Sequence, residues 1–259
     1  MSGISQIRAS FVRSMRIFLR DKAIIGSSIL LPVFFLVVLP LVFFQQVPAE
    51  FMPALRGFLV VAMVTLVIMG TAMSNLPGSI AADRNRDLYS KLSSMPVNPL
   101  HECLGRIVTV FVFSAIGSLV VIVLGVVLGA ELAVTSIDLL LIIGLTSVII
   151  LFASGVGLII ASAAKSESAA AHVGVAIVML IYFIGIAIPY NDLPDMLRPV
   201  VHLNPICLGN NMITELAVGN GIVGYNPFNI TDVTVMLLLT TFLFIIGLHV
   251  YSRYCWRKQ

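Results

Sequence analysis

Long apolar runs alternate with short polar segments along the whole chain, and this alternation predicts a helical membrane protein. Each run is long enough to cross the bilayer core, which takes about 20 apolar residues in a helix. A helix satisfies its own backbone hydrogen bonds in lipid, and the runs lack the period-two alternation of barrel strands. We therefore expect an all-α polytopic protein with six transmembrane helices, at residues 23–44, 57–80, 105–129, 138–164, 171–189 and 232–251.

The segment before the first apolar run, residues 1–22, predicts an amphipathic helix on the membrane surface. Apolar residues recur there at steps of three or four, and arginines occupy positions between them. The apolar members are Ile4, Ile7, Phe11, Met15 and Phe18, and the basic members are Arg8, Arg13, Arg16 and Arg20. A basic face of this kind suits an anionic membrane leaflet. The alternative is a basic flank without defined structure.

The long segment between the last two runs, residues 190–231, is too apolar for a free loop and too interrupted for a span. The residues that divide it are Pro194, Pro199, Pro205, Gly209, Gly219, Gly221 and Gly224. Broken backbone is tolerated in a membrane protein where neighbouring helices bury it. We therefore expect a re-entrant helical hairpin packed against the spans, and the alternative is a long structured loop.

The polar stretch DRNRDLYSKLSSMPVNP, residues 83–99, predicts a short amphipathic helix between the second and third spans. Its apolar residues fall on one helical face, which consists of Leu88, Leu92 and Met95. Asp83 or Asn85 is expected to cap the start of this helix, and Pro96 to end it at the preceding residue. Such a helix either lies on the lipid or docks into a groove of another protein.

Composition excludes a soluble domain. Hydrophobic residues make up 59% of the 259 residues and charged residues only 10%, whereas a soluble domain carries about 25% charged residues. The three cysteines, Cys103, Cys207 and Cys255, are too far apart for a zinc motif or a disulfide framework.

Lysine and arginine positions predict the orientation of the spans. All 15 of these residues except Arg56 and Arg198 fall at residues 8–22, 84–106, 165 and 253–258, which alternate with the spans. The opposite segments carry the acidic residues Glu50, Glu131, Asp138, Asp192, Asp195, Glu215 and Asp232. Because positive charge gathers on the cytoplasmic side, both termini and the stretch 83–99 are expected to face the cytoplasm.

The chain carries no motif that would make it an enzyme. It has no G-x-x-x-x-G-K-[ST] phosphate loop, no H-E-x-x-H and no G-x-S-x-G. The four histidines, His101, His172, His202 and His249, are dispersed. The span interiors hold almost no ionisable residue, which disfavours an ion-coupled carrier. Energy for transport is therefore expected to come from another chain.

Together these features resemble an ABC-2 type permease, the membrane half of an ABC exporter. The stretch FLRDKAIIGSSILLPVFFLVVLP is similar to the family's Arg-Asp pair before a proline-containing first span. The stretch IAADRNRDLYSKLSSMPVNPLHECLGRIV matches the family's central motif, in order, at Asp83-Arg84, Leu88, Leu92, Pro96-Val97 and Gly105-Arg106. LPDMLRPVVHLNPICLGNNMI resembles its external segment with a late Asn-Pro. The chain departs from the family pattern at Asp83, Asp87 and Glu215, where Glu, Gly and Arg are usual.

The resemblance implies a single transmembrane domain over residues 1–259, with 23–189 holding spans one to five and 232–259 holding span six and a cytoplasmic tail. Segment 85–95 would be a coupling helix seated in the cleft of an ATP-binding subunit. Its contact set would be Asp83, Arg84, Arg86, Leu88, Tyr89, Lys91, Leu92, Met95 and Pro96, with the interfacial residues Phe11, Arg13, Arg16, Phe18 and Arg20 beside it. An external gate would include Pro189, Asp192, Pro194, Asn204 and Pro205.

The implied partners are two copies of a P-loop ATP-binding subunit, a second permease copy and the lipid bilayer. The second copy makes a homodimer, or a heterodimer with a related permease. ATP and Mg would bind the ATP-binding subunits, and this chain would hold no cofactor, no metal, no catalytic residue and no nucleic acid.

The aromatic content of the spans favours a lipophilic substrate, such as a drug, a lipid or a lipid-linked molecule. These aromatics are Phe34, Phe35, Phe43, Phe44, Phe111, Phe113, Tyr182 and Phe183. The expected function is outward transport across the cytoplasmic (inner) membrane of the cell. The alternatives are a polysaccharide-export or haem-exporter-like permease subunit, and a membrane assembly or anchoring protein that transports nothing.

Overall fold

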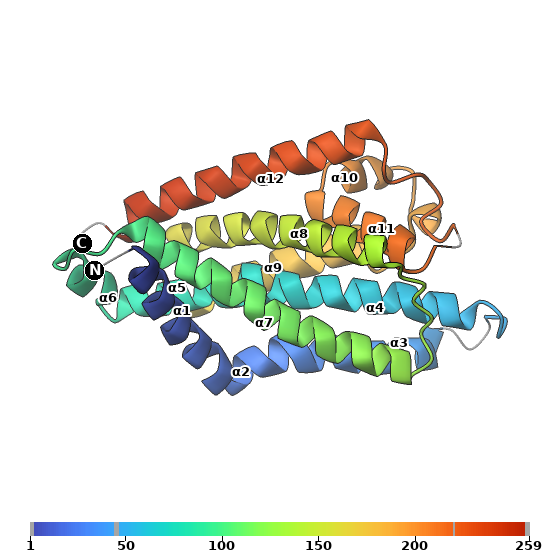
Figure 1. Ribbon diagram of the computed structural model, residues 1–259, viewed down its shortest axis with the longest axis horizontal. Coiled ribbons are helices and arrows are strands. Elements are labelled where there is room, and N and C mark those ends of the chain that lie inside the picture. The colour runs from blue at the N-terminus through green and yellow to red at the C-terminus, as the bar shows by residue number, and fades with distance from the viewer. Residues whose placement is uncertain (1–2, 44–46, 220, 257–259) are drawn as a thin grey trace.

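A computed structural model describes residues 3–43, 47–219 and 221–256 as a bundle of long helices (Figure 1). Every regular element in these ranges is helical. Six of the helical segments are long and apolar enough to cross a membrane: Lys22–Val42, Met52–Asn85, Pro99–Val127, Ser136–Ala163, Glu167–Gly185 and Ile230–Cys255. They confirm the six spans that the sequence predicted. Phe44, Arg257 and Lys258, which entered the sequence predictions, lie outside the described residues.

The first span is reached through a helix that lies across the bundle. Helix α1 (Gly3–Arg20) packs along α7 and ends one residue before α2 (Lys22–Ile25). The carboxylate of Asp21, in the gap, accepts a hydrogen bond from the backbone N–H of Ala23 at 2.8 Å and so caps α2. The chain then continues through the π-helical η1 (Gly26–Leu30) into α3 (Leu31–Phe43).

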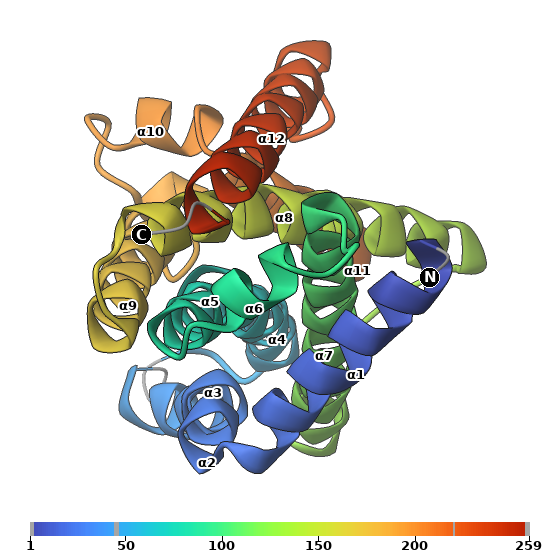
Figure 2. The same ribbon diagram turned by 90° about the vertical axis from the view of Figure 1, so that its left-hand side faces the viewer.

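The second span forms the centre of the bundle and is longer than predicted. It consists of α4 (Met52–Met69), the π-helical segment η2 (Gly70–Asn75) and α5 (Leu76–Asn85). Of its most apolar stretch, 89% is buried, because the other spans surround it (Figure 2). Pro77 has no N–H, so the carbonyl of Met73 one turn earlier loses its helical donor, and the π-helical η2 ends two residues before this proline.

The remaining spans begin at capped N-termini. They are α7 (Pro99–Val127), α8 (Ser136–Ala163), α9 (Glu167–Gly185) and α12 (Ile230–Val250), which continues into the π-helical η4 (Tyr251–Cys255). The side chains that accept backbone hydrogen bonds at these starts are Asn98, Thr135, Ser166 and Asn229. Polar caps therefore mark where each apolar run begins.

The bundle has two distinct ends. The start of α1, η4 and the short helix α6 (Leu88–Ser93) lie at one end, which we call the α6 end (Figure 1). The segments η3 (Tyr190–Asp192), α10 (Arg198–His202) and α11 (Pro205–Ala217) lie at the opposite end. This arrangement agrees with the alternation of basic and acidic segments along the chain.

Helix α11 is buried although it is too short to cross a membrane. It has 13 residues, which span about 20 Å, and it contacts α4, α8 and α12. Asn204 caps it and Pro205 occupies its first turn. The predicted helical breaks in residues 190–231 are thus present, while the re-entrant position of this segment in a membrane stays a prediction.

Candidate functional site

Four charged side chains, three of them buried and the fourth, Arg13, half-buried, form a cluster at the α6 end. The guanidinium of Arg106 donates from Nη2 to Asp83 Oδ2 at 2.6 Å and from Nε to Glu102 Oε1 at 2.7 Å. Arg13 Nη2 approaches the same two carboxylate oxygens, at 2.7 Å from Asp83 and 3.4 Å from Glu102. Two cations thus face two anions, and the cluster has no net charge.

Three helices contribute these side chains, so the cluster joins them. Arg13 comes from α1, Asp83 from the last turns of α5, and Glu102 and Arg106 from the first turns of α7. Arg106 is 1% exposed, and Asp83 and Glu102 are also buried. Because buried charges are costly unless paired, these pairings fix the relative positions of α1, α5 and α7.

Small residues let α1 lie close enough to α7 for this contact. A Cβ on Gly105 would lie 2.5 Å from the carbonyl oxygen of Ile7, so a larger residue would push α1 away. The hydroxyl of Ser10 donates to the carbonyl of Glu102 at 2.7 Å. The glycine of the predicted Gly105-Arg106 pair therefore has a packing role, and the arginine an electrostatic one.

Two tyrosines connect the cluster to α6 and to the last span. Tyr251 in η4 donates a hydrogen bond to the carboxylate of Glu102, and its hydroxyl lies 3.2 Å from that of Tyr89. The Tyr89 ring also packs on Trp256, with centroids 5.6 Å apart, and lies 5.8 Å from the Arg106 guanidinium carbon. Burial raises the pKa of Tyr89 well above its usual range, which keeps its hydroxyl protonated.

Helix α6 contacts this network through its single buried residue, Tyr89. Leu88 and Leu92 are half-buried, and Met95 is exposed. They line, with Val97 and residues of α1, a cavity of about 250 Å³ between α6 and α1. The predicted apolar face therefore turns partly toward α1, and the residues that α6 presents outward are Ser90, Lys91 and Ser93.

Two details of the predicted short helix are wrong. Asp87, with a left-handed φ of 54°, precedes α6, whereas Asp83 and Asn85 belong to α5 and cap nothing. Asp83 is held instead by the two arginines of the cluster. The helix ends at Ser93 rather than Met95, because the Met95 N–H turns back to the carbonyl of Leu92 at 3.0 Å.

The other predicted residues around α6 have separate roles. Arg84 donates to the carbonyls of Ala161, at 3.1 Å, and Ala164, and so caps the end of α8. The carbonyl of Pro96 accepts from Gln6 Nε2 at 3.1 Å, which ties the chain after α6 to α1. Arg86 and Lys91 are exposed to solvent. Of the predicted contact set, only Asp83 and Tyr89 join the buried network.

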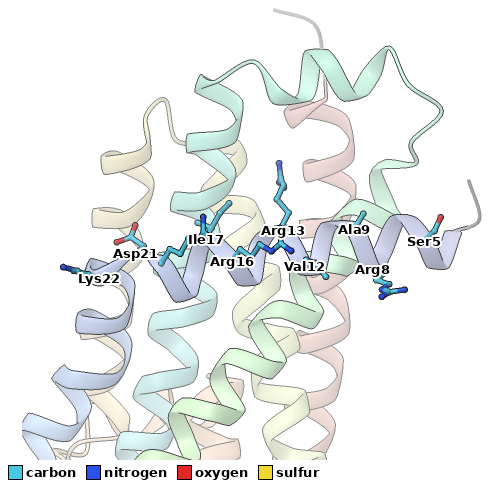
Figure 3. A pocket seen from close by; sticks show the side chains of 10 residues that line it. Ser5, Arg8, Ala9, Val12, Arg13, Arg16, Ile17, Asp21 and Lys22 are labelled. Carbon is cyan, nitrogen blue, oxygen red and sulfur yellow. The ribbon is translucent and has the colours of Figure 1, made fainter.

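In the predicted interfacial helix α1, the buried and exposed side chains differ in part from those expected. Phe18 is buried against Phe113, with ring centroids 5.3 Å apart, and Phe11 is half-buried. Ile4, expected on the apolar face, is 80% exposed, because Ser10 and Ser14 make the close contact with the bundle instead. In Figure 3, Arg13 points toward the α6 end, and Arg8 points to the opposite side of α1.

At the opposite end, the predicted gate residues occupy turns and helix starts. Pro189 precedes η3, and Asp192 and Pro194 are exposed. The side chain of Asn204 accepts from the N–H of Ile206 at 3.0 Å, where α11 begins with the buried Pro205. Their part in a gate stays a prediction.

Sequence reasoning missed a polar network at that end. His202 lies between the Asp232 carboxylate, 3.0 Å from Nδ1, and the Tyr190 hydroxyl, 3.0 Å from Nε2. The rings of Tyr190 and Tyr225 pack on each other, with centroids 4.4 Å apart. Burial raises the pKa of Tyr225 to about 12. In the sequence, His202 is only one of four dispersed histidines, because its partners Tyr190 and Asp232 lie 12 and 30 residues away.

Glu102, Tyr251 and Trp256 were also missed. The available signal was Glu102 with Arg106, an opposite-charge pair four residues apart at the start of an apolar helix. No comparable signal exists for the tyrosine and tryptophan, which contact α6 only in the folded bundle. Within the described ranges no three His, Cys, Asp or Glu side chains are placed to hold a metal ion.

The six apolar helices and their packing define a multi-pass membrane protein. The sequence profile of the ABC-2 type transporter family matches residues 5–218. The chain therefore belongs to the ABC-2 type transporter family, as the resemblance indicated, and is a membrane permease of that type. This family is a membrane transport domain that is not itself catalytic and generally works with an ATP-binding subunit. A comparison with curated proteins found no match.

Proposed function

We propose that this chain is the transmembrane subunit of an ATP-driven exporter and that α6 is its coupling helix. The observation that carries the proposal is the attachment of α6, through Tyr89, to a buried ion cluster shared by α1, α5 and α7. A force on α6 would reach spans two, three and six through contiguous contacts. The absence of a phosphate-loop motif from the sequence supports an ATPase on a separate chain.

In this proposal the α6 end faces the cytoplasm, because most lysines and arginines flank the spans on that side. Two ATP-binding subunits, each holding ATP and Mg, dock on the α6 helices of two permease copies. Closure of the ATP-binding pair moves α6, and the spans open toward the other side. The segment from η3 to α11 serves as the external gate.

An apolar cavity supports a lipophilic substrate. It has a volume of about 380 Å³, within the usual range for small-molecule sites, and lies between α3, α4 and α9. Its lining is formed by Phe35, Leu39, Leu59, Tyr182, Phe183, Ala187, Ile188 and Pro189. This lining contains no charged side chain, which favours a drug, lipid or lipid-linked molecule over a free ion.

Loss of ATPase association tests the docking of α6. The double substitution Leu88→Asp with Leu92→Asp is expected to abolish co-purification of a P-loop ATP-binding subunit, identified by mass spectrometry, while the permease still inserts. Met95→Asp should weaken the association as well, and it is the safer variant because Met95 is 57% exposed, so a charge there disturbs the packing less than at Leu88 or Leu92.

The matched control is Leu203→Asp, which places the same charge on an exposed leucine at the opposite end. It should leave co-purification unchanged. Equal recovery of the ATP-binding subunit with wild type, Met95→Asp and the double variant would show that α6 is not the docking element.

A further inference from the structure

A polar cavity opens at the α6 end between spans one, two and five. It has a volume of about 370 Å³ and lies where α5 has α9 on one side and the start of span one on the other (Figure 2). Its lining mixes charged, hydroxyl and amide groups with apolar side chains. We call it the three-span cavity, and the lining residues that matter for its chemistry are Asp21, Ser27, Asn75, Arg86, Glu167 and Val175.

Asn75 brings an uncommitted acceptor to the lining of the three-span cavity. It is the last residue of the π-helical η2 and only 9% exposed. Its amide donates from Nδ2 to the hydroxyl of Ser28, which belongs to the π-helical η1 of span one. Among the residues that the structure describes, none donates a hydrogen bond to Asn75 Oδ1. This oxygen is therefore free to accept one from a ligand in the cavity.

Two carboxylates nearer the surface are also available. Glu167 begins α9 and is exposed, and no described basic side chain lies within ion-pair distance of it. Asp21 is exposed as well, and its Oδ1 accepts from the backbone N–H of Ala23 at 2.8 Å. No described residue bonds its second carboxylate oxygen. Both side chains can therefore accept further hydrogen bonds and carry uncompensated negative charge.

The other charged groups on the lining leave this acceptor character in place. Asp83 is already neutralised by Arg13 and Arg106. Arg86 is the one guanidinium on the lining, and His172 is the other basic side chain. Two free carboxylates and an amide oxygen best match a ligand group that is positively charged and donates several N–H bonds. An alkylammonium has both properties, with three donors and no acceptor.

The apolar part of the ligand is indicated by the same three spans. Ile24 and Val175 lie on the lining of the three-span cavity beside its polar groups. The apolar cavity of about 380 Å³ lies between the same spans, nearer the opposite end. Its Tyr182 is about 10 Å further along α9 than Val175, because a helix rises 1.5 Å per residue. Polar and apolar surfaces thus follow each other in the order that suits an amphipathic molecule.

We propose that the three-span cavity binds the ammonium end of a lipophilic amine. Glu167 and Asp21 attract the cation at the opening, and Asn75 accepts a hydrogen bond further inside. The assignment rests on the proposed export function, since it names the class of molecule that is transported. In the proposed orientation the cavity opens at the cytoplasmic end, where an exporter collects its substrate.

Equilibrium binding of dansylcadaverine to the purified chain in dodecyl maltoside tests the site. This probe is a primary amine joined by an alkyl chain to a naphthalene ring, whose fluorescence rises in apolar surroundings, so a titration yields a Kd. The double variant Asp21→Asn, Glu167→Gln should raise the Kd about three- to tenfold, as expected for ion pairs at exposed positions. Asparagine still caps α2, so the fold is kept. Ser27→Phe, which fills the cavity from an exposed position, should abolish saturable binding.

A matched double variant controls for net charge. Asp87→Asn, Glu131→Gln removes two exposed carboxylates that do not line the cavity, and it should bind dansylcadaverine with the Kd of wild type. N-acetyl dansylcadaverine, which has no charge, should bind wild type and both double variants with one common, higher Kd. An equal Kd for the amine in wild type and the Asp21→Asn, Glu167→Gln variant would overturn the proposal. So would an equal loss in both double variants, or saturable binding that persists in Ser27→Phe.

The binding measurement needs no ATP-binding subunit, so it fails independently of the proposed coupling through α6. If the ATP-binding subunit co-purifies but wild type does not distinguish the amine from its acetylated form, the cavity assignment alone is wrong. If the amine binds as predicted but no ATP-binding subunit is recovered, the binding site is supported and its role in ATP-driven export is not.

Discussion

Arg106 decides the geometry of the α6 end at the residue scale. It is 1% exposed and bonds two carboxylates from two helices, while Arg13 reaches the same pair from a third. The neutral set of four is tolerated in the interior because each carboxylate has two cationic neighbours. Removing one arginine leaves an unbalanced buried negative charge.

Substitution of Arg106 should therefore be strongly destabilising. Arg106→Met keeps most of the side-chain volume but leaves the buried Asp83 and Glu102 without this cationic partner. We expect the unfolding free energy to fall by about 3–5 kcal/mol. The measurement is thermal or denaturant unfolding of the purified protein in detergent. Arg253→Met, at an exposed position, should cost less than about 0.5 kcal/mol. If Arg106→Met lowered the unfolding free energy as little as this control, the cluster would contribute little to stability.

Tyr89 provides a finer test of the connection to α6. Tyr89→Phe keeps the ring contacts with Tyr251 and Trp256 but loses the hydroxyl that lies 3.2 Å from Tyr251. We expect a loss of about 1 kcal/mol in the unfolding free energy. Tyr254→Phe, on an exposed tyrosine, is the control and should be neutral. An unchanged unfolding free energy in Tyr89→Phe would indicate that the contact between the two hydroxyls does not stabilise the fold.

The sequence predicted some of these residues and not their roles. Asp83-Arg84 stood out as a charged pair in an apolar chain, yet Asp83 proved to be a partner of Arg106, and Arg84 a cap for α8. Pairings between residues far apart in the chain, such as Tyr251 with Glu102, depend on how the helices pack and leave no local pattern.

At the scale of elements, η2 is the feature that hydropathy could not reveal. The six apolar runs predicted the spans correctly because length and composition alone decide what crosses a membrane. The π-helical turn in the second span ends two residues before Pro77. Glycines of two neighbouring helices fit against its carbonyls: Gly157 of α8 against Ala72, and Gly174 of α9 against Met73.

Gly174 should tolerate no side chain. A Cβ there would lie 1.9 Å from the carbonyl oxygen of Met73 and 2.7 Å from Cα of Ser74, and both are backbone atoms that cannot rotate away. We expect Gly174→Ala to lower the unfolding free energy by about 1–3 kcal/mol. Gly144→Ala is the matched control, because nothing lies within 4 Å of its Cβ, and it should be neutral or stabilising by up to about 1 kcal/mol. Equal melting temperatures for the two variants would contradict the tight packing of η2.

At the scale of the whole molecule, the placement of α6 and the charge distribution support the same proposed orientation. The start of α1, α6 and η4 share one end, and η3, α10 and α11 share the other (Figure 1). The three native cysteines, at 103, 207 and 255, are buried, so a cysteine introduced on the surface would be the reactive one. Orientation can then be read from chemical labelling.

Ser93→Cys should react with a membrane-impermeant maleimide only from the cytoplasmic side. Ser93 is exposed at the end of α6, and the orientation proposed from the basic flanks puts this end inside the cell. Labelling in intact cells and in inverted vesicles separates the two faces. Reaction of Ser93→Cys in intact cells would reverse the orientation and remove the basis for cytoplasmic coupling.

The contact between α6 and an ATP-binding subunit is the central claim, and a photocrosslink from Ser93→Cys tests it most directly. A benzophenone maleimide attached at this cysteine, in native membranes, is predicted to form an adduct with a P-loop ATP-binding subunit on illumination. The same label on Leu203→Cys, exposed at the opposite end, should form none. An adduct from position 203, or its absence from position 93 in an assembled complex, would contradict the account.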